Sequence, residues 1–114
     1  MSLEEYQKFV FGACNLFDED PSQSWHNRRA DQQKIVDLLN SREKVRYLGD
    51  GIDISFSTKG RTWINSDGQT NMPSGEVYTS PVEDSVNGTI NFSYPGLYGG
   101  HEVEGVTLWV KDGY

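Results

Sequence analysis

Apolar side chains recur at every third or fourth position from Leu3 to Phe17, which is the period of an amphipathic helix. Ser2, followed three residues later by Glu5, has the pattern of a capping box at the start of this helix. The acidic cluster that begins at Asp18 marks its end. The pattern therefore predicts a first helix, whose apolar stripe consists of Leu3, Tyr6, Phe9, Val10, Ala13, Cys14 and Phe17.

A second, less regular stripe follows Pro21. Proline suits the first turn of a helix because its ring fixes φ and its missing N–H is not needed there, and Asp20 is placed to cap that turn. The helical period stops at about Ser41. We expect the two helices to pack as a helical hairpin over residues 1–41. The stripe of the second helix consists of Trp25, Arg28, Arg29, Gln32, Ile35, Val36, Leu38 and Leu39.

After Ser41 the apolar period changes to two residues, which is typical of strands. The alternating runs Lys44–Leu48 and Ile52–Ser57 flank the short loop Gly49-Asp50-Gly51, and this arrangement predicts a β-hairpin. A further short strand is predicted over Arg61–Ile64. The basic side chain of Arg61 can pair with a nearby carboxylate such as Asp53 or Asp67. The alternative is that this side chain is solvated.

Three more segments follow the strand period. Asn87-Gly88 is the strongest turn signal of the chain, and it predicts a hairpin between the runs 82–86 and 89–93. The aromatic, glycine-rich stretch Tyr94–Gly100 is predicted as a packed crossover loop, with the lining of a binding cleft as the alternative. The last strand is predicted over Val103–Val110 and runs into a turn at Asp112-Gly113.

These elements together predict an α+β fold, with two N-terminal helices followed by a mainly antiparallel β-sheet built from hairpins. We expect residues 1–114 to form a single fragment, with the helical hairpin in 1–41 and the β-rich part in 42–114. The apolar strand Val103–Val110 is followed by a turn and no further strand, so one sheet edge is expected to stay unpaired. We therefore expect an incomplete part of a larger domain, and association of this edge with a partner, in a homodimer.

Composition excludes some classes of partner. The net charge is −7, and no basic run occurs, which argues against binding to nucleic acid or to an anionic membrane. No apolar stretch approaches the roughly 18 residues of a membrane span. The single cysteine, Cys14, cannot form an internal disulfide and is predicted to be a small buried hydrophobic residue. These features indicate a cytoplasmic protein.

One carboxylate stands out from the rest of the chain. Pro73 and Gly75 predict a tight turn that leads Glu76 into a short β-prone run, and Pro81 ends the pairing of that run. A carboxylate held by strand backbone is better fixed than one on a loop, as a metal ligand or a general base requires. The alternative is a solvated glutamate beside a turn.

Four blocks carry a family resemblance: Gly60–Gly68, Asn71–Val77, Pro81–Gly88 and Glu102–Val106. In their residues, order and spacing these blocks closely resemble the M29 (thermophilic-type) metalloaminopeptidases. The helical region resembles the segment that leads into the peptidase domain of that family. The resemblance covers essentially the whole chain, as the first part of the peptidase domain.

The resemblance implies that Glu76 is a metal ligand, because it matches the ligand in the Asn-Met-Pro-x-Gly-Glu block. It implies an enzyme that releases N-terminal amino acids from peptides with a water activated by two divalent ions, which are zinc, cobalt, manganese or magnesium. The remaining ligands and the catalytic tyrosine of the family would follow Tyr114. The fragment itself is therefore expected to be inactive, to contain no catalytic residue and to hold no ion tightly.

The sequence contains other polar residues that are candidates for the site. Glu83 and Asp84 match family positions that are not ligands, and we expect them to form supporting hydrogen bonds. His101 lies outside the matching blocks, but it is a further candidate for a residue of the binding cleft. Glu102 and Glu104 are also candidates for this cleft. A function from a different class is also open: a stand-alone β-rich module that binds a peptide or a sugar through the aromatic segment Tyr94–Tyr98.

Overall fold

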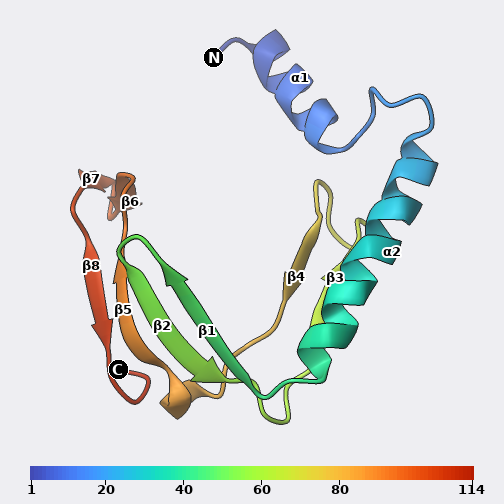
Figure 1. Ribbon diagram of the computed structural model, residues 1–114. Coiled ribbons are helices and arrows are strands. Elements are labelled where there is room, and N and C mark those ends of the chain that lie inside the picture. Colours follow the sequence, from blue (N-terminus) through green and yellow to red (C-terminus); the bar gives the residue numbers. More distant parts are fainter. The chain divides into compact units, whose positions relative to one another are not determined.

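The computed structural model describes residues 1–114 and contains two α-helices and eight strands (Figure 1). The chain forms two compact units. The first unit comprises Met1–Ser41 and Thr62–Thr79, and the second comprises Arg42–Arg61 and Ser80–Tyr114. The first unit therefore combines the two helices with a segment that lies later in the chain.

Helix α1 spans Leu3–Ala13 and begins with the predicted capping box, in which Ser2 and Glu5 bond to each other's backbone N–H. It ends earlier than the sequence predicts. Asn15 adopts a left-handed conformation with φ 59°, and its N–H bonds to Gly12 O, while Leu16 N bonds to Phe11 O. These two bonds form a Schellman motif, which closes the helix although the apolar stripe continues.

Helix α2 spans Pro21–Asn40, with Asp20 as its N-cap and Pro21 in its first turn, as predicted. Its two buried residues, Gln32 and Val36, are four positions apart and so lie on one face. This face contacts strands β3 (Ile64–Ser66) and β4 (Glu76–Tyr78), which pair with each other antiparallel. Figure 1 shows this two-stranded hairpin along the helix.

The two helices do not pack against each other as the predicted hairpin over residues 1–41 requires. The structure has no contact between α1 and α2, and α1 has no buried residue. The segment between them is fixed by the indole of Trp25, whose Nε1 donates to Cys14 O at 2.9 Å. The buried face of α2 is occupied by β3 and β4 instead, a non-local partner that helical periodicity cannot reveal.

The strand predicted over Arg61–Ile64 is displaced towards the C-terminus, because β3 begins only at Ile64. Arg61 N bonds to Thr58 O within a turn, and Trp63 N donates to Asn40 Oδ1 at 2.9 Å. The backbone of Trp63 therefore bonds to the last residue of α2 and not to a neighbouring strand. The side chain of Trp63 is buried.

The second unit is built on a four-stranded antiparallel sheet in the order β1-β2-β5-β8. Strands β1 (Lys44–Gly49) and β2 (Ile52–Ser57) form the predicted hairpin. Strand β5 spans Asn87–Asn91 and β8 spans Thr107–Val110. Strand β8 lies at one edge of this sheet and pairs only with β5.

The turn predicted at Asn87-Gly88 is wrong. Both residues lie inside β5, where Gly88 pairs with Ile54 of β2 and with Val110 of β8. Gly88 has φ 138°, and a Cβ at this position would collide with Asp53 O. The glycine is therefore required by the close approach of β2 and not by a turn. The residues before it, Glu83–Ser85, form a short 3₁₀ helix, η1.

The segment predicted as a loop contains a small hairpin. Strand β6 spans Gly96–Tyr98 and pairs antiparallel with β7, His101–Val103. The predicted strand over Val103–Val110 is accordingly divided, because the chain turns at Gly105, with φ 64°, before β8 begins. Local apolar alternation does not reveal this interruption.

The fold class is confirmed: an α+β chain with two helices followed by antiparallel strands. Its buried apolar residues include Cys14, as predicted. The other three are Val36, Ile54 and Trp63. Many large apolar side chains remain exposed, and neither helix is long and apolar enough to cross a membrane.

Candidate functional site

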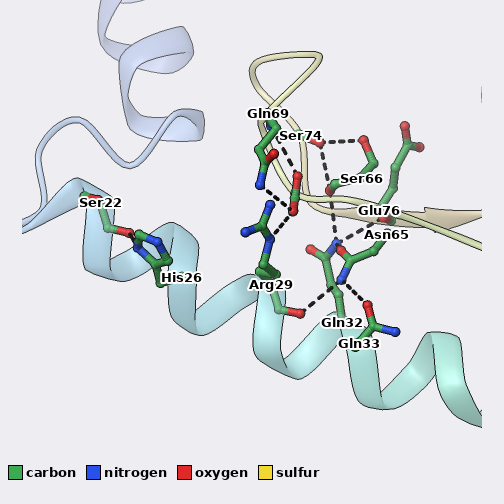
Figure 2. A network of polar contacts seen from close by, with 11 residues as sticks. Ser22, His26, Arg29, Gln32, Gln33, Asn65, Ser66, Gln69, Ser74 and Glu76 are labelled. Carbon is green, nitrogen blue, oxygen red and sulfur yellow. Dashed lines mark hydrogen bonds and ion pairs between the residues drawn. The ribbon is translucent and has the colours of Figure 1, made fainter.

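Glu76 is the first residue of β4 and pairs with Ser66 of β3. Successive side chains of a strand point to opposite faces. Val77 is half-buried on the face that contacts α2, whereas Glu76 is exposed, and Figure 2 shows its carboxylate pointing away from the helix. The structure thus presents this carboxylate to solvent from a strand whose other face is anchored.

The anchor of this strand is the amide of Gln32, which lies in the buried face of α2. Its Nε2 donates to Asn65 Oδ1 at 2.8 Å, to Ser66 O at 3.0 Å and to Glu76 O at 3.1 Å (Figure 2). An amide nitrogen carries two hydrogens, so one of them is shared between two acceptors. One side chain therefore holds β3 and β4 together at the residue pair that contains Glu76.

The loop before Glu76 is tied to the same point. Ser66 O also accepts from Ser74 Oγ at 2.8 Å and from Gly75 N at 3.1 Å, and the two serine hydroxyls lie 2.7 Å apart. Gly75 has φ 110°, which only glycine adopts without strain. The peptide bond between Met72 and Pro73 is cis. Through the bonds to Ser66, Glu76 follows a loop that is closed onto its own neighbouring strand.

Three further hydrogen bonds fix this loop and β3 to α2. Arg29 Nε donates to Asp67 Oδ2, and this hydrogen bond is the main reason that the pKa of Asp67 lies below its ordinary value of 3.8. Asn65 Nδ2 donates to Arg29 O at 3.1 Å and to Gln33 Oε1 at 3.2 Å. Asp67 is therefore paired with Arg29 and not with Arg61.

The carboxylate of Glu76 forms no hydrogen bond and no ion pair within the chain, since the residue's contact with Gln32 is made by its backbone oxygen. Asp53, Asp67 and Glu83, in contrast, each pair with an arginine. A carboxylate must be accessible to bind a metal ion. Glu76 is exposed, and no cation of the chain competes for its oxygens.

A complete metal site does not exist among these residues. No group of three or more His, Cys, Asp or Glu side chains is arranged to hold an ion. Tightly filled sites need about three or four protein ligands. The residues of the chain therefore do not form a metal-binding site by themselves.

The other candidates belong to the second unit. Glu83 and Asp84 lie in η1, and His101 and Glu102 lie in β7, with Glu104 directly after it. Glu83 accepts from Arg61 Nη2 at 2.7 Å, so the predicted partners of Arg61, Asp53 and Asp67, are wrong. The pKa of Glu83 is lowered by its own backbone N–H and by the charge of Arg61.

The sequence did not predict Gln32 as the anchor of β3 and β4, although it placed Gln32 in the stripe of the second helix. The available signal was its spacing of four residues from Val36, which puts a polar amide on the buried face. A buried amide needs hydrogen-bond partners. Which residues supply them could not be read from the helix, because all three acceptors lie more than thirty residues further along.

Comparison with known proteins gives a single family. The family model described as "Thermophilic metalloprotease (M29)" matches residues 1–114. Aminopeptidase AmpS of Bacillus subtilis is 30% identical over 91% of the chain, and aminopeptidase T of Thermus thermophilus is 30% identical over 92%. Aminopeptidase 2 of Geobacillus stearothermophilus is 26% identical over 98%.

The chain is much shorter than these relatives. The matched region represents 28% of the AmpS and aminopeptidase T sequences and 30% of the aminopeptidase 2 sequence. The chain thus spans less than a third of the length of the curated relatives that it matches.

Proposed function

The chain belongs to the thermophilic metalloprotease (M29) family, and we propose that it is part of a metal-dependent aminopeptidase in which Glu76 provides one metal ligand. The family is the one that the motif blocks predict, and the matched relatives are named as aminopeptidases. The observation that carries the proposal for Glu76 is its free, exposed carboxylate on a backbone that α2 and β3 hold in place.

The role of Glu76 is to bind a divalent ion through a carboxylate oxygen. Carboxylates are ligands for zinc, manganese and magnesium alike, so this residue does not select among them. Two bound ions would supply an activated water and would polarise the carbonyl of the first peptide bond. The chain's own contribution is to orient the ligand: β4 directs the side chain away from α2, and the closed loop 67–75 fixes where the strand begins.

The remaining ligands would come from the rest of a family-length protein, since the relatives are more than three times as long as the region matched here. A single carboxylate binds divalent ions only weakly. The 114-residue chain alone is therefore proposed to be inactive and to hold no ion tightly. The substrates of the family-length protein would be peptides with a free N-terminus.

Two further proposals concern the setting of the protein. A homodimer is supported by the exposed apolar side chains along the sheet edge at β8, including Leu108 and Trp109. A cytoplasmic location is supported by the single cysteine, which is buried and unpaired in the structure.

The test of the proposed function is Glu76→Gln in the family-length protein. Glutamine has nearly the same shape but lacks the charge, so the variant should fold normally and lose bound metal together with at least about 100-fold in kcat/KM on an aminoacyl-chromophore substrate. The matched control is Glu19→Gln, because Glu19 is exposed and has no partner. Metal content measured by atomic absorption and turnover equal to those of the unchanged protein would refute the role of Glu76.

A second function has one observation in its favour. An apolar groove of about 570 Å³ in the second unit is lined by Tyr94 and Leu97 of the aromatic segment that a peptide- or sugar-binding module would use, and by residues outside this segment such as Ile90 and Leu108. Titration of the 114-residue chain with short apolar peptides tests this alternative. Saturable binding that Tyr94→Ala removes would favour it, whereas the absence of any heat change would argue against peptide binding in this groove.

A further inference from the structure

We propose that Gln32 of α2 is a positioning residue for the metal ligand Glu76, acting through the backbone of β4. This inference rests on the proposed function of Glu76. It adds a residue from a different part of the chain, because Gln32 and Glu76 are separated by 44 positions and meet only in the fold. Gln32 itself does not contact the metal ion or the substrate.

The orientation of the Gln32 amide is set by its neighbours. Its nitrogen faces three oxygen atoms, which belong to Asn65, Ser66 and Glu76, at 2.8 to 3.1 Å. If the amide were turned over, its own oxygen would face these three acceptors and repel them. The donor side is therefore fixed by its surroundings, and it joins the two strands at the pair Ser66–Glu76.

Gln32 is also buried. The residue is only 7% exposed, and its Oε1 has no hydrogen-bond partner. A helix face that served packing alone would be better filled by an apolar side chain, as Val36 fills the next turn, since that would leave no buried acceptor unpaired. The amide nitrogen of Gln32 donates hydrogen bonds that an apolar side chain could not provide.

One of these bonds reaches Glu76 directly. The oxygen that Gln32 binds belongs to the backbone of Glu76 itself, so the contact constrains the Cα from which the carboxylate extends. Metal–ligand distances tolerate only about 0.2 Å of error. Residues that orient a ligand therefore affect metal affinity, typically by about 10- to 100-fold when they are replaced.

The experiment uses the family-length protein and the substitution Gln32→Met, which keeps length and burial but removes the amide. The readout is the dissociation constant of the metal-free protein for zinc, measured by calorimetry, together with thermal unfolding without metal. The matched control is Gln23→Met on the same helix, because the side-chain amide of Gln23 bonds only to Asn27, one turn away. Gln32→Asn, which shortens the side chain by one methylene, serves as a second variant if Gln32→Met does not fold.

We expect the zinc dissociation constant to rise about 10-fold or more in a folded Gln32 variant and to change less than about twofold in Gln23→Met. A purely structural role would lower the unfolding temperature but leave the affinity of the folded protein unchanged. The inference is overturned if Glu76→Gln loses metal but the zinc dissociation constant of Gln32→Met is unchanged. If only Gln32→Asn folds, the zinc dissociation constant of that variant decides in the same way. Retention of metal by Glu76→Gln overturns the proposed function and this inference with it.

Discussion

Acidic side chains of this chain differ in what neutralises them. Asp53 accepts two hydrogen bonds from Arg46, Asp67 accepts one from Arg29, and Glu83 accepts one from Arg61. Glu76 has no cation in contact, although it lies beside the hydrogen-bond network that Gln32 centres. Glu76 is therefore not held in an ion pair, in contrast to these three carboxylates.

The paired carboxylates give a pH prediction for Asp67. Its pKa in the folded chain is below the ordinary 3.8 because Arg29 donates to it, so folding favours the ionised form. Its stabilising contribution is therefore complete above about pH 5 and is lost as the pH falls through the lowered pKa. We expect Asp67→Asn to lower the free energy of unfolding by about 1 kcal/mol at pH 7, since Arg29 is partly exposed and solvent screens the pair.

Urea unfolding of both proteins at about pH 7 and about pH 3 measures this effect. The difference between them should shrink at the lower pH, where part of the Asp67 population is protonated. A difference that is the same at both pH values would show that the ion pair does not produce it.

Gly75 provides a second residue-scale prediction. Its φ of 110° is unfavourable for any residue with a Cβ, and a Cβ there would also lie 2.9 Å from Arg28 Nη1. Gly75→Ala should therefore destabilise the protein by about 1–3 kcal/mol. Gly49→Ala is the control, because no atom lies within 4 Å of the position that the added methyl group would take and its φ is not positive. Thermal unfolding compares the two, and equal melting temperatures would argue against a strained requirement at Gly75.

Single elements show how far the sequence carries the fold. The N-caps of both helices and the hairpin over residues 44–57 follow from neighbours in the chain, and the sequence predicts them correctly. It misplaces the end of α1, because Asn15 closes the helix inside a continuing apolar stripe. It predicts Glu76 at the start of a strand, where the structure has it, but the anchor Gln32 depends on contacts between distant segments.

The dipeptide Asn87-Gly88 is the clearest failure of local reasoning. The same residues favour a tight turn when the flanking strands pair with each other, and a strand interior when a third strand approaches closely. In the structure Gly88 lies between β2 and β8, and only a long-range contact decides between these two uses. The partner of Arg61 is mispredicted for the same reason.

The role of Gly88 can be tested directly at the level of the sheet. A methyl group on Gly88 would overlap Asp53 O, so β2 and β5 would have to separate. We expect Gly88→Ala to lower the free energy of unfolding by more than about 2 kcal/mol. Gly96→Ala in β6 is the control, since its nearest neighbour would be an ordinary contact at 3.8 Å. Comparable denaturant midpoints for the two variants would contradict this account of β5.

At the scale of the whole molecule, the main feature is how much apolar surface stays exposed. Leu97, Tyr94, Tyr98 and Trp109 are each more than 70% exposed, although monomeric proteins rarely present such side chains in groups. The matched relatives are more than three times as long as the region that the chain covers. Both facts agree with a chain whose apolar faces are covered in a larger protein.

The sheet edge at β8 leads to a prediction about association. An exposed apolar edge strand favours the addition of another strand, so we expect the 114-residue chain alone to self-associate at high concentration. Trp109→Lys should reduce this association, because a lysine on an edge opposes strand pairing. Tyr6→Lys on α1 adds the same charge outside the sheet and should have little effect. Light scattering that reports a strict monomer for the unchanged chain would contradict the prediction.

The most direct test of the central claim is the position of the metal ion relative to Glu76. Crystals of the family-length protein grown with zinc allow the ion to be located by anomalous scattering. We expect a zinc ion about 2.0–2.2 Å from a carboxylate oxygen of Glu76. A fully occupied metal centre that leaves the Glu76 carboxylate more than about 5 Å from any ion, beyond the reach of direct coordination, would contradict this expectation.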